Sequence, residues 1–148
     1  MALYRNILVA IDGSPDATAA LRHAAALARD QNALLTLLSV APNSGASATT
    51  AGANPDDPLE FYARMLREAV ATLPADAGVK TLLERGVPAE AILATAERDG
   101  SDLIVMGSHG HGRFVRALVG SVSERVLKAS PVPVLLLRSG PSVDDAGA

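Results

Sequence analysis

Short apolar runs alternate with helical patterns along almost the whole chain. Apolar runs of strand length cover five segments, residues 7–11, 34–40, 79–83, 103–106 and 132–137. Their apolar residues are nearly continuous, which is typical of strands buried on both faces of a parallel sheet. Apolar residues recur with helical spacing in four intervening segments, residues 17–28, 57–73, 88–100 and 113–129. We expect the last of these helices to be broken near Gly120.

Strictly alternating strands and helices predict a single-domain α/β fold, with a doubly wound five-stranded parallel sheet and helices on both faces. Right-handed crossovers leave few topologies, and the commonest has the strand order 3-2-1-4-5. This order reverses direction between the first and fourth strands, and ligands of open α/β sheets bind in the crevice at such a point. The loops above it would be Asp12-Gly13-Ser14 and the run from Gly107 to Gly112.

Two segments lie outside this pattern, and one proline affects the position of the last strand. Residues 43–57 are rich in Ser, Gly, Ala, Thr and Pro without periodicity, so we expect a flexible loop. The domain should cover residues 1–140 and be followed by a disordered tail, residues 141–148. Pro133 lacks an amide donor, which suits an edge position or the start of the last strand.

Composition excludes several classes of protein. The 148 residues contain no cysteine, which excludes thiol catalysis, thiolate zinc sites and disulfides. A net charge of −3 with evenly mixed signs argues against a general nucleic-acid surface. No segment approaches the ~20 apolar residues that a membrane span requires, and the N-terminal apolar run is too short for a signal peptide. We therefore expect a cytoplasmic protein with no membrane or nucleic-acid partner.

The glycine-rich segment after the fourth strand is the strongest chemical signal. Glycines at 107, 110 and 112 allow positive φ and remove side chains that would block a phosphate. Ser121 and Glu124 follow with capping-box spacing, so a helix should start there with free N–H groups facing the crevice. The spacing Gly107-x2-Gly110-x9-Gly120-Ser121 predicts two backbone anion sites on one polyphosphate. The alternative is that the glycines only end a strand and Ser121 only caps a helix.

Two residues near the crevice have alternative interpretations. The carboxylate of Asp12 could accept a hydrogen bond from a ribose hydroxyl or an adenine amine, or hold Mg²⁺ through water. It could equally be a turn residue that accepts from the amides of Gly13 and Ser14. Val40, at the end of the second strand, could form an apolar wall for a base or simply belong to the core.

Basic residues surround the glycine-rich segment. His109, His111, Arg113 and Arg116 make it locally cationic; Arg113 is the first candidate for a phosphate contact, whereas Arg116 suits an exposed helix start. The His109-x-His111 pair has no third ligand nearby, so no metal site is predicted from the protein alone.

The segments Asn6–Ser14, Ile104–Gly110 and Gly120–Val126 together resemble the universal stress protein family. The resemblance extends from about Tyr4 to Arg138. Pro131-Val132-Pro133-Val134 also looks like the family's entry into its last strand. Members that bind ATP carry the pattern Gly-x2-Gly-x9-Gly-Ser/Thr, which is complete here from Gly107 to Ser121. The resemblance therefore implies an ATP-binding protein, with Mg²⁺ accompanying the ATP.

The resemblance also implies the site residues. Those around adenine and ribose would be Ala10, Ile11, Asp12, Val40 and Met106. Those around the phosphates would be Gly107, His109, Gly110, Arg113, Gly120, Ser121, Val122 and Ser123. Family members usually form homodimers, often through the last strand, here Val132–Leu137. One departure concerns Gly110-His111-Gly112-Arg113: many relatives carry their arginine directly after the glycine, whereas here the arginine is shifted to Arg113.

These features favour a nucleotide-binding stress-response or regulatory protein over an efficient enzyme. No Gly-x4-Gly-Lys-Ser/Thr loop occurs, so the lysine that stabilises a transferring phosphoryl group is missing. Slow ATP hydrolysis or self-phosphorylation at Ser121 or Ser123 remains an alternative. An ATP-dependent activating enzyme and a dimeric adaptor that binds no nucleotide are two further alternatives.

Overall fold

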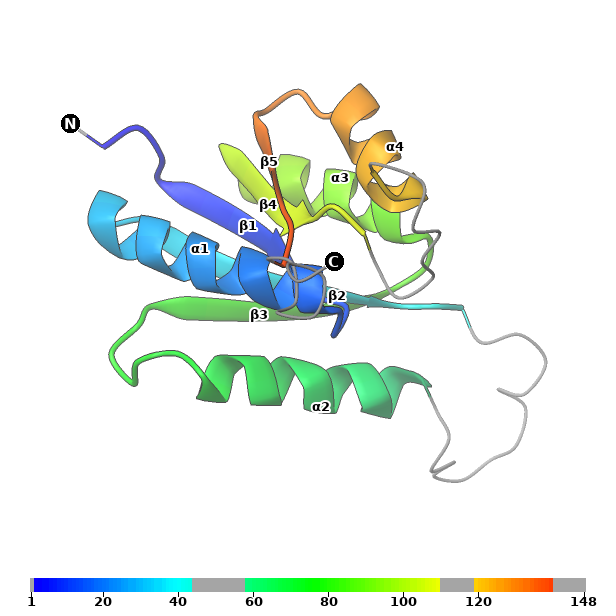
Figure 1. Cartoon of the computed structure of the whole chain (residues 1–148), viewed down its shortest axis with the longest axis horizontal. Helices are drawn as coiled ribbons and strands as arrows, with labels where there is room; N and C mark the ends of the chain where they lie inside the picture. The colour runs from blue at the N-terminus through cyan, green and yellow to red at the C-terminus, as the bar shows by residue number, and fades with distance from the viewer. Residues whose placement is uncertain (1, 44–57, 110–118, 140–148) are drawn as a thin grey trace, which may run out of the picture.

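A computed structural model describes residues 2–43, 58–109 and 119–139. Five strands and four helices alternate through these residues (Figure 1). In chain order they are β1 (Asn6–Ala10), α1 (Pro15–Gln31), β2 (Leu34–Ala41), α2 (Pro58–Ala71), β3 (Val79–Arg85), α3 (Pro88–Asp99), β4 (Leu103–Gly107), α4 (Ser121–Ala129) and β5 (Val134–Leu137).

The strands form one parallel sheet in the order β3-β2-β1-β4-β5, which confirms the predicted fold and topology. Strand β1 lies at the centre, where Leu8 is in register with Thr36 of β2 and with Ile104 of β4. The central residues of β1 are almost completely buried, as their continuous apolar run predicted. The carboxyl ends of β1 and β4 are therefore neighbours.

Each face of the sheet carries its own hydrophobic core. On one face, Val9 and Val105 pack with Leu21 of α1 and Leu66 of α2. On the other face, Leu8 and Ile104 pack with helices α3 and α4. Because successive side chains of a strand point to opposite faces, the continuous apolar runs supply both cores at once.

Local capping sets the helix ends. The hydroxyl of Ser14 accepts a hydrogen bond from the amide of Ala17 at 3.1 Å, and Pro15 occupies the first turn of α1. Helix α3 ends at Gly100, whose φ of 66° is left-handed. The predicted capping box of α4 is wrong, because Gly120 is the N-cap and Ser121 is already the first helical residue.

Strand β5 is shorter than predicted and lies at an edge of the sheet. It begins at Val134 rather than Val132, and Pro133 precedes it, in agreement with the expected role of this proline. All four residues of β5 are half-buried. The predicted loop at residues 43–57 lies outside the described residues except for Asn43, as do residues 113–118 of the predicted fourth helix and the predicted tail.

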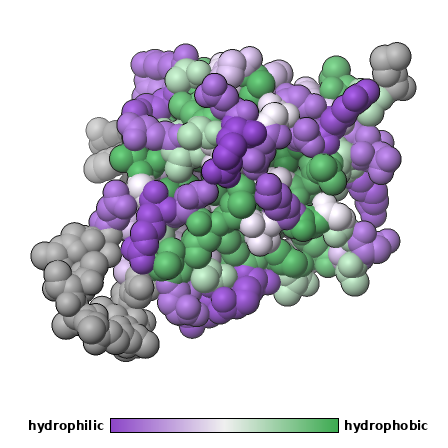
Figure 2. Space-filling model, turned by 180° about the vertical axis from the view of Figure 1, so that it is seen from behind, coloured by the Kyte–Doolittle hydropathy of each residue, from purple (hydrophilic) through white to green (hydrophobic). Residues whose placement is uncertain are grey.

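The surface mixes polar and apolar residues. Seen from behind, hydrophobic residues gather across the middle of the molecule, between polar residues above and below (Figure 2). Large hydrophobic side chains that are exposed include Leu34, Phe61 and Leu127. In the described part of the chain, no helix has the length and hydrophobicity needed to cross a membrane.

Candidate functional site

A cavity of about 290 Å³ lies above the carboxyl ends of β1 and β4. It forms there because the chain leaves β1 toward α1 on one face of the sheet, while α4 covers the other face. Every predicted site residue that the structure describes lines this cavity: Ala10, Ile11, Asp12, Val40, Met106, Gly107, His109, Gly120, Ser121, Val122 and Ser123. Gly110 and Arg113 lie outside the described residues, as do His111 and Arg116.

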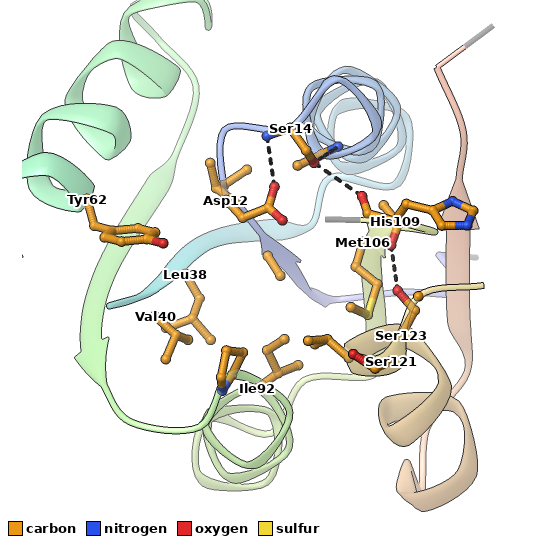
Figure 3. A pocket seen from close by; sticks show the side chains of 17 residues that line it. Asp12, Ser14, Leu38, Val40, Tyr62, Ile92, Met106, His109, Ser121 and Ser123 are labelled. Carbon is orange, nitrogen blue, oxygen red and sulfur yellow. Dashed lines mark hydrogen bonds between the residues drawn. The ribbon is translucent and has the colours of Figure 1, made fainter. Parts of the chain in front are cut away.

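One end of the cavity is apolar. Leu38, Val40 and Ile92 lie side by side there, and the phenol ring of Tyr62 faces them from α2 (Figure 3). Ser14 belongs to a loop that was predicted to lie above the crevice, but five other lining residues were not predicted: Ala17, Leu38, Tyr62, Pro88 and Ile92. Their apolar members were assigned to strand or helix cores, because periodicity shows which face is apolar but not where that face ends above a crevice.

The opposite end of the cavity is formed by the N-terminus of α4. Gly120 has extended backbone angles, φ −71° and ψ 166°, and no side chain in the described part of the chain caps the helix. The first amides of a helix have no intrahelical acceptor, and the helix dipole adds partial positive charge there. Ser121, Val122 and Ser123 therefore present backbone N–H donors to a cavity that is otherwise largely apolar.

Gly107 does not have the positive φ that was predicted for it, and the structure gives a packing reason for glycine at this position. Among the described glycines, positive φ occurs at Gly13, Gly86 and Gly100 but not at Gly107. A Cβ atom on Gly107 would instead lie 2.7 Å from the Cβ of Asp16 and 2.9 Å from the amide nitrogen of Ala17. The missing side chain lets the first turn of α1 pack directly on the end of β4.

Ser123 is buried beneath the cavity rather than exposed at its surface. Its hydroxyl donates a hydrogen bond of 2.7 Å to the carbonyl oxygen of Gly107, and the residue is 3% exposed. Because a hydroxyl has a single hydrogen, this bond occupies it, and the hydroxyl cannot donate to a phosphate at the same time. Ser121, by contrast, is exposed. The backbone amide of Ser123 can still donate a hydrogen bond to a ligand.

Asp12 forms the turn that was one of its two predicted roles. Its Oδ1 accepts a hydrogen bond of 2.9 Å from the amide of Ser14. This bond holds the loop between β1 and α1 at the edge of the cavity (Figure 3). A contact with ribose or with water-bound Mg²⁺ remains a prediction.

His109 makes contacts through both its backbone carbonyl and its imidazole ring. Its carbonyl oxygen accepts a hydrogen bond from the Ser14 hydroxyl at 3.3 Å. Its imidazole Nδ1 lies 3.1 Å from the Ser108 hydroxyl and 3.5 Å from Oδ2 of Asp16. Figure 3 shows the ring directed away from the cavity. The ring thus lies beside a carboxylate, and its predicted contact with phosphate remains a prediction.

The carboxylate of Asp16 accepts hydrogen bonds from two separate segments. Partial burial on its own raises the pKa of Asp16. Hydrogen bonds from the amide and hydroxyl of Ser139, the hydroxyl of Ser108 and the amide of His109 outweigh this effect. The pKa of Asp16 is therefore below its ordinary value of 3.8, because each donor stabilises the ionised form.

This lowered pKa predicts a loss of stability in acid. The folded protein binds the Asp16 proton more weakly than the unfolded chain, so the ionised carboxylate stabilises the fold above pH 3.8. That contribution decreases as the pH falls through the lower pKa of the folded state. We expect the difference in unfolding free energy between wild type and Asp16→Asn to be constant near neutral pH and to shrink below pH 3.8, measured by urea unfolding. A difference that grows in acid would contradict the assignment.

No metal centre is built into the described residues. Within residues 2–43, 58–109 and 119–139, no group of three or more His, Cys, Asp or Glu side chains could hold a metal ion. In the described part of the chain, the cavity therefore presents backbone amides at one end and an apolar surface at the other. That combination suits a ligand with an anionic part and a flat apolar part.

Comparison with known proteins gives consistent matches. The family model described as the universal stress protein family matches residues 3–138. A universal stress protein of Methanocaldococcus jannaschii is 33% identical over 92% of this chain and 83% of its own length. The structure of a universal stress protein from Lactobacillus plantarum superposes with a TM-score of 0.71 at 32% identity, covering 93% of this chain and all of the other.

One further similar structure contains a ligand. It is a universal stress protein in complex with cAMP, which superposes with a TM-score of 0.74 at 26% identity. The match covers 94% of this chain and all of that protein.

Proposed function

The chain belongs to the universal stress protein family, and on that premise we propose that it is a regulatory, stress-response protein that binds ATP in the cavity between β1 and β4. The observation that carries the proposal is the N-terminus of α4, which no side chain of the described residues caps and which lies at the polar end of a largely apolar cavity. Helix N-termini of this kind bind phosphate through backbone amides and the helix dipole.

The shape of the cavity suits the two parts of a nucleotide. Leu38, Val40 and Ile92 offer an apolar surface on which adenine can lie. The amides of Ser121 and Val122 would hold phosphate at the other end. Asp12, between them at the end of β1, would accept from ribose or hold Mg²⁺ through water. A similar protein in complex with cAMP supports an adenine nucleotide as the ligand class.

ATP would act as a sensed ligand rather than as the substrate of an efficient enzyme. The chain lacks a P-loop lysine, and the Ser123 hydroxyl is engaged by Gly107. Slow hydrolysis or self-phosphorylation is a second possibility, for which the exposed Ser121 is the better candidate of the two serines. Turnover above about 1 s⁻¹ would argue for an enzyme instead.

Assembly as a homodimer through Val132–Leu137 is part of the same proposal. Strand β5 lies at an edge of the described sheet, with β4 as its neighbour there, and its residues are half-buried. An apolar edge strand invites pairing with another chain. Sedimentation of the protein with and without ATP would test whether the dimer forms and whether the ligand affects it.

The first experiment is to identify any nucleotide that the purified protein carries. Protein purified gently and then denatured should release ATP or ADP, identified by chromatography and mass spectrometry. Calorimetry with Mg-ATP and with cAMP then measures affinity directly. A protein that carries no nucleotide and binds none when it is added would contradict the proposal and favour the dimeric adaptor.

Ser121→Pro tests the amides of α4 without disturbing the helix. Proline is favoured at the first position of a helix, and the extended conformation of Gly120 is compatible with a following proline. The change removes one N–H donor, so we expect ATP affinity to fall about five-fold, the size of a typical hydrogen bond of about 1 kcal/mol. The unfolding temperature should not decrease.

The matched control for this variant is Ser121→Ala. It removes the hydroxyl but keeps the amide, so its ATP affinity should stay within about two-fold of wild type if the backbone binds the phosphates. Equal losses in both variants would assign the contact to the hydroxyl. No loss in either would place the phosphates elsewhere.

A further inference from the structure

The carboxylate of Asp16 joins three segments that are far apart in the sequence. It lies in the first turn of α1 and is 14% exposed. Its Oδ2 accepts from the hydroxyl of Ser108 at 3.0 Å and from the amide of His109 at 3.2 Å. Its Oδ1 accepts from the amide and hydroxyl of Ser139, at 2.8 and 2.9 Å. Both oxygens are thus occupied, each by a different segment.

The contact with Ser108 continues to the anion-binding end of α4. The carbonyl oxygen of Ser108 accepts a hydrogen bond of 2.6 Å from the amide of Gly120, the N-cap of that helix. The neighbouring carbonyl of Gly107 accepts the Ser123 hydroxyl at 2.7 Å. The position of residues 107–109 therefore determines where the first turn of α4 lies relative to the cavity.

The contact with Ser139 connects the same carboxylate to the edge of the sheet. Ser139 follows two residues after the end of β5, and the amide of Ser108 donates to the carbonyl of Leu137 at 2.9 Å. Ser139 does not line the cavity. Asp16 thus links the end of the edge strand to the segment that holds α4.

We propose that Asp16 is a positioning residue of the nucleotide site, which aligns the N-terminus of α4 with the cavity through Ser108 and couples that alignment to the end of β5. The inference rests on the proposed function, since it assigns how the phosphate end of that site is held in place. Asp16 itself does not line the cavity and acts through other residues. Ligand binding and ordering of Ser139 should then favour each other, because such coupling is reciprocal.

Asp16→Asn separates this role from general packing. Asparagine has nearly the same shape, but its amide nitrogen is a donor and cannot accept a hydrogen bond. In one orientation of the asparagine amide, the donors of Ser139 lose their acceptor. In the other orientation, the donors of Ser108 and His109 lose theirs. The control is Glu60→Gln, which removes an acidic charge from the first turn of α2, where Glu60 pairs only with the exposed Arg67 among the described residues.

Calorimetry with ATP and with adenosine gives the first readout. Because Asp16 positions the phosphate end, Asp16→Asn should raise the Kd for ATP about ten-fold, equivalent to about 1.4 kcal/mol, and leave the Kd for adenosine unchanged. Glu60→Gln should leave both unchanged. Equal weakening of ATP and adenosine would indicate a general structural effect and overturn the proposal, as would unchanged binding of ATP.

Hydrogen exchange of the ligand-free protein gives the second readout, which does not depend on nucleotide binding. The amides of Ser139 and Gly120 should both exchange faster in Asp16→Asn than in wild type, although only Ser139 bonds to the carboxylate directly. Faster exchange at Ser139 alone, or at neither amide, would overturn the link to α4. A wild type that binds no nucleotide would instead refute the proposed function, while this measurement would still decide whether the link exists.

Discussion

Gly107→Ala is expected to destabilise the fold by about 3 kcal/mol, at the upper end of the usual effect of overpacking. The new Cβ would lie 2.7–2.9 Å from the Cβ and carbonyl carbon of Asp16 and the amide nitrogen of Ala17. Two of these are backbone atoms in the first turn of α1, so no flexible side chain can move aside. Relief requires α1 to move away from β4, which would also disturb the bonds of Asp16. Urea and thermal unfolding measure the effect.

The unfolding temperature should fall by about 10 °C, since 1 kcal/mol corresponds to about 2–4 °C in a domain of this size. The matched control is Gly78→Ala, because a Cβ on Gly78 meets nothing within 4 Å and its φ is not positive. That variant should be as stable as wild type or slightly more stable. If the two variants unfold at the same temperature, the close approach of α1 to β4 is not the reason for glycine at position 107.

Ala10→Leu is expected to abolish most of the nucleotide affinity while leaving the fold intact. Ala10 is the last residue of β1, is half-buried and lines the cavity of about 290 Å³. Leucine adds three carbon atoms, which can enter this open space without displacing the core but would overlap a bound nucleoside. Forcing extra methylene groups into an occupied site costs about 1–3 kcal/mol, so the Kd for ATP should rise about ten- to hundred-fold.

Calorimetry of Ala10→Leu alongside Ala25→Leu checks this expectation. Ala25 is also half-buried, but it lies on α1 and lines a different hollow at the far end of that helix. The same substitution there should leave the Kd for ATP unchanged. If Ala10→Leu binds ATP as tightly as wild type, the nucleoside does not lie above the end of β1.

The fold could be predicted from the chain alone because its local and global signals agree. Continuous apolar runs such as Ile7–Ile11 suit strands buried on both faces, and their alternation with amphipathic helices leaves few topologies. The strand order then places Asp12 and Gly107 at one crevice. Boundaries were less accurate: β3 extends to Arg85, and β5 begins two residues late, after Pro133.

The apolar end of the site could not be predicted in the same way. Tyr62 and Ile92 have the helical spacing of ordinary core residues, but each lies in the N-terminal part of its helix, and the structure brings both to the cavity above the strand ends. A periodic pattern defines a face of a helix but not the point along the axis at which that face loses its partner.

The sequence by itself determined the topology and the place of the crevice, because these follow from hydrophobic periodicity and from the few allowed connections. The resemblance to a family pointed to part of the cavity lining, among it Asp12, Gly107 and Ser123. Only the tertiary structure decided what those residues do. It assigned Gly107 to the contact with α1, the Ser123 hydroxyl to Gly107 and the helix cap to Gly120. It also brought Asp16 to Ser108 and Ser139, which are 92 and 123 residues away along the chain. Such long-range hydrogen bonds depend on distances of a few ångströms, which no local pattern encodes.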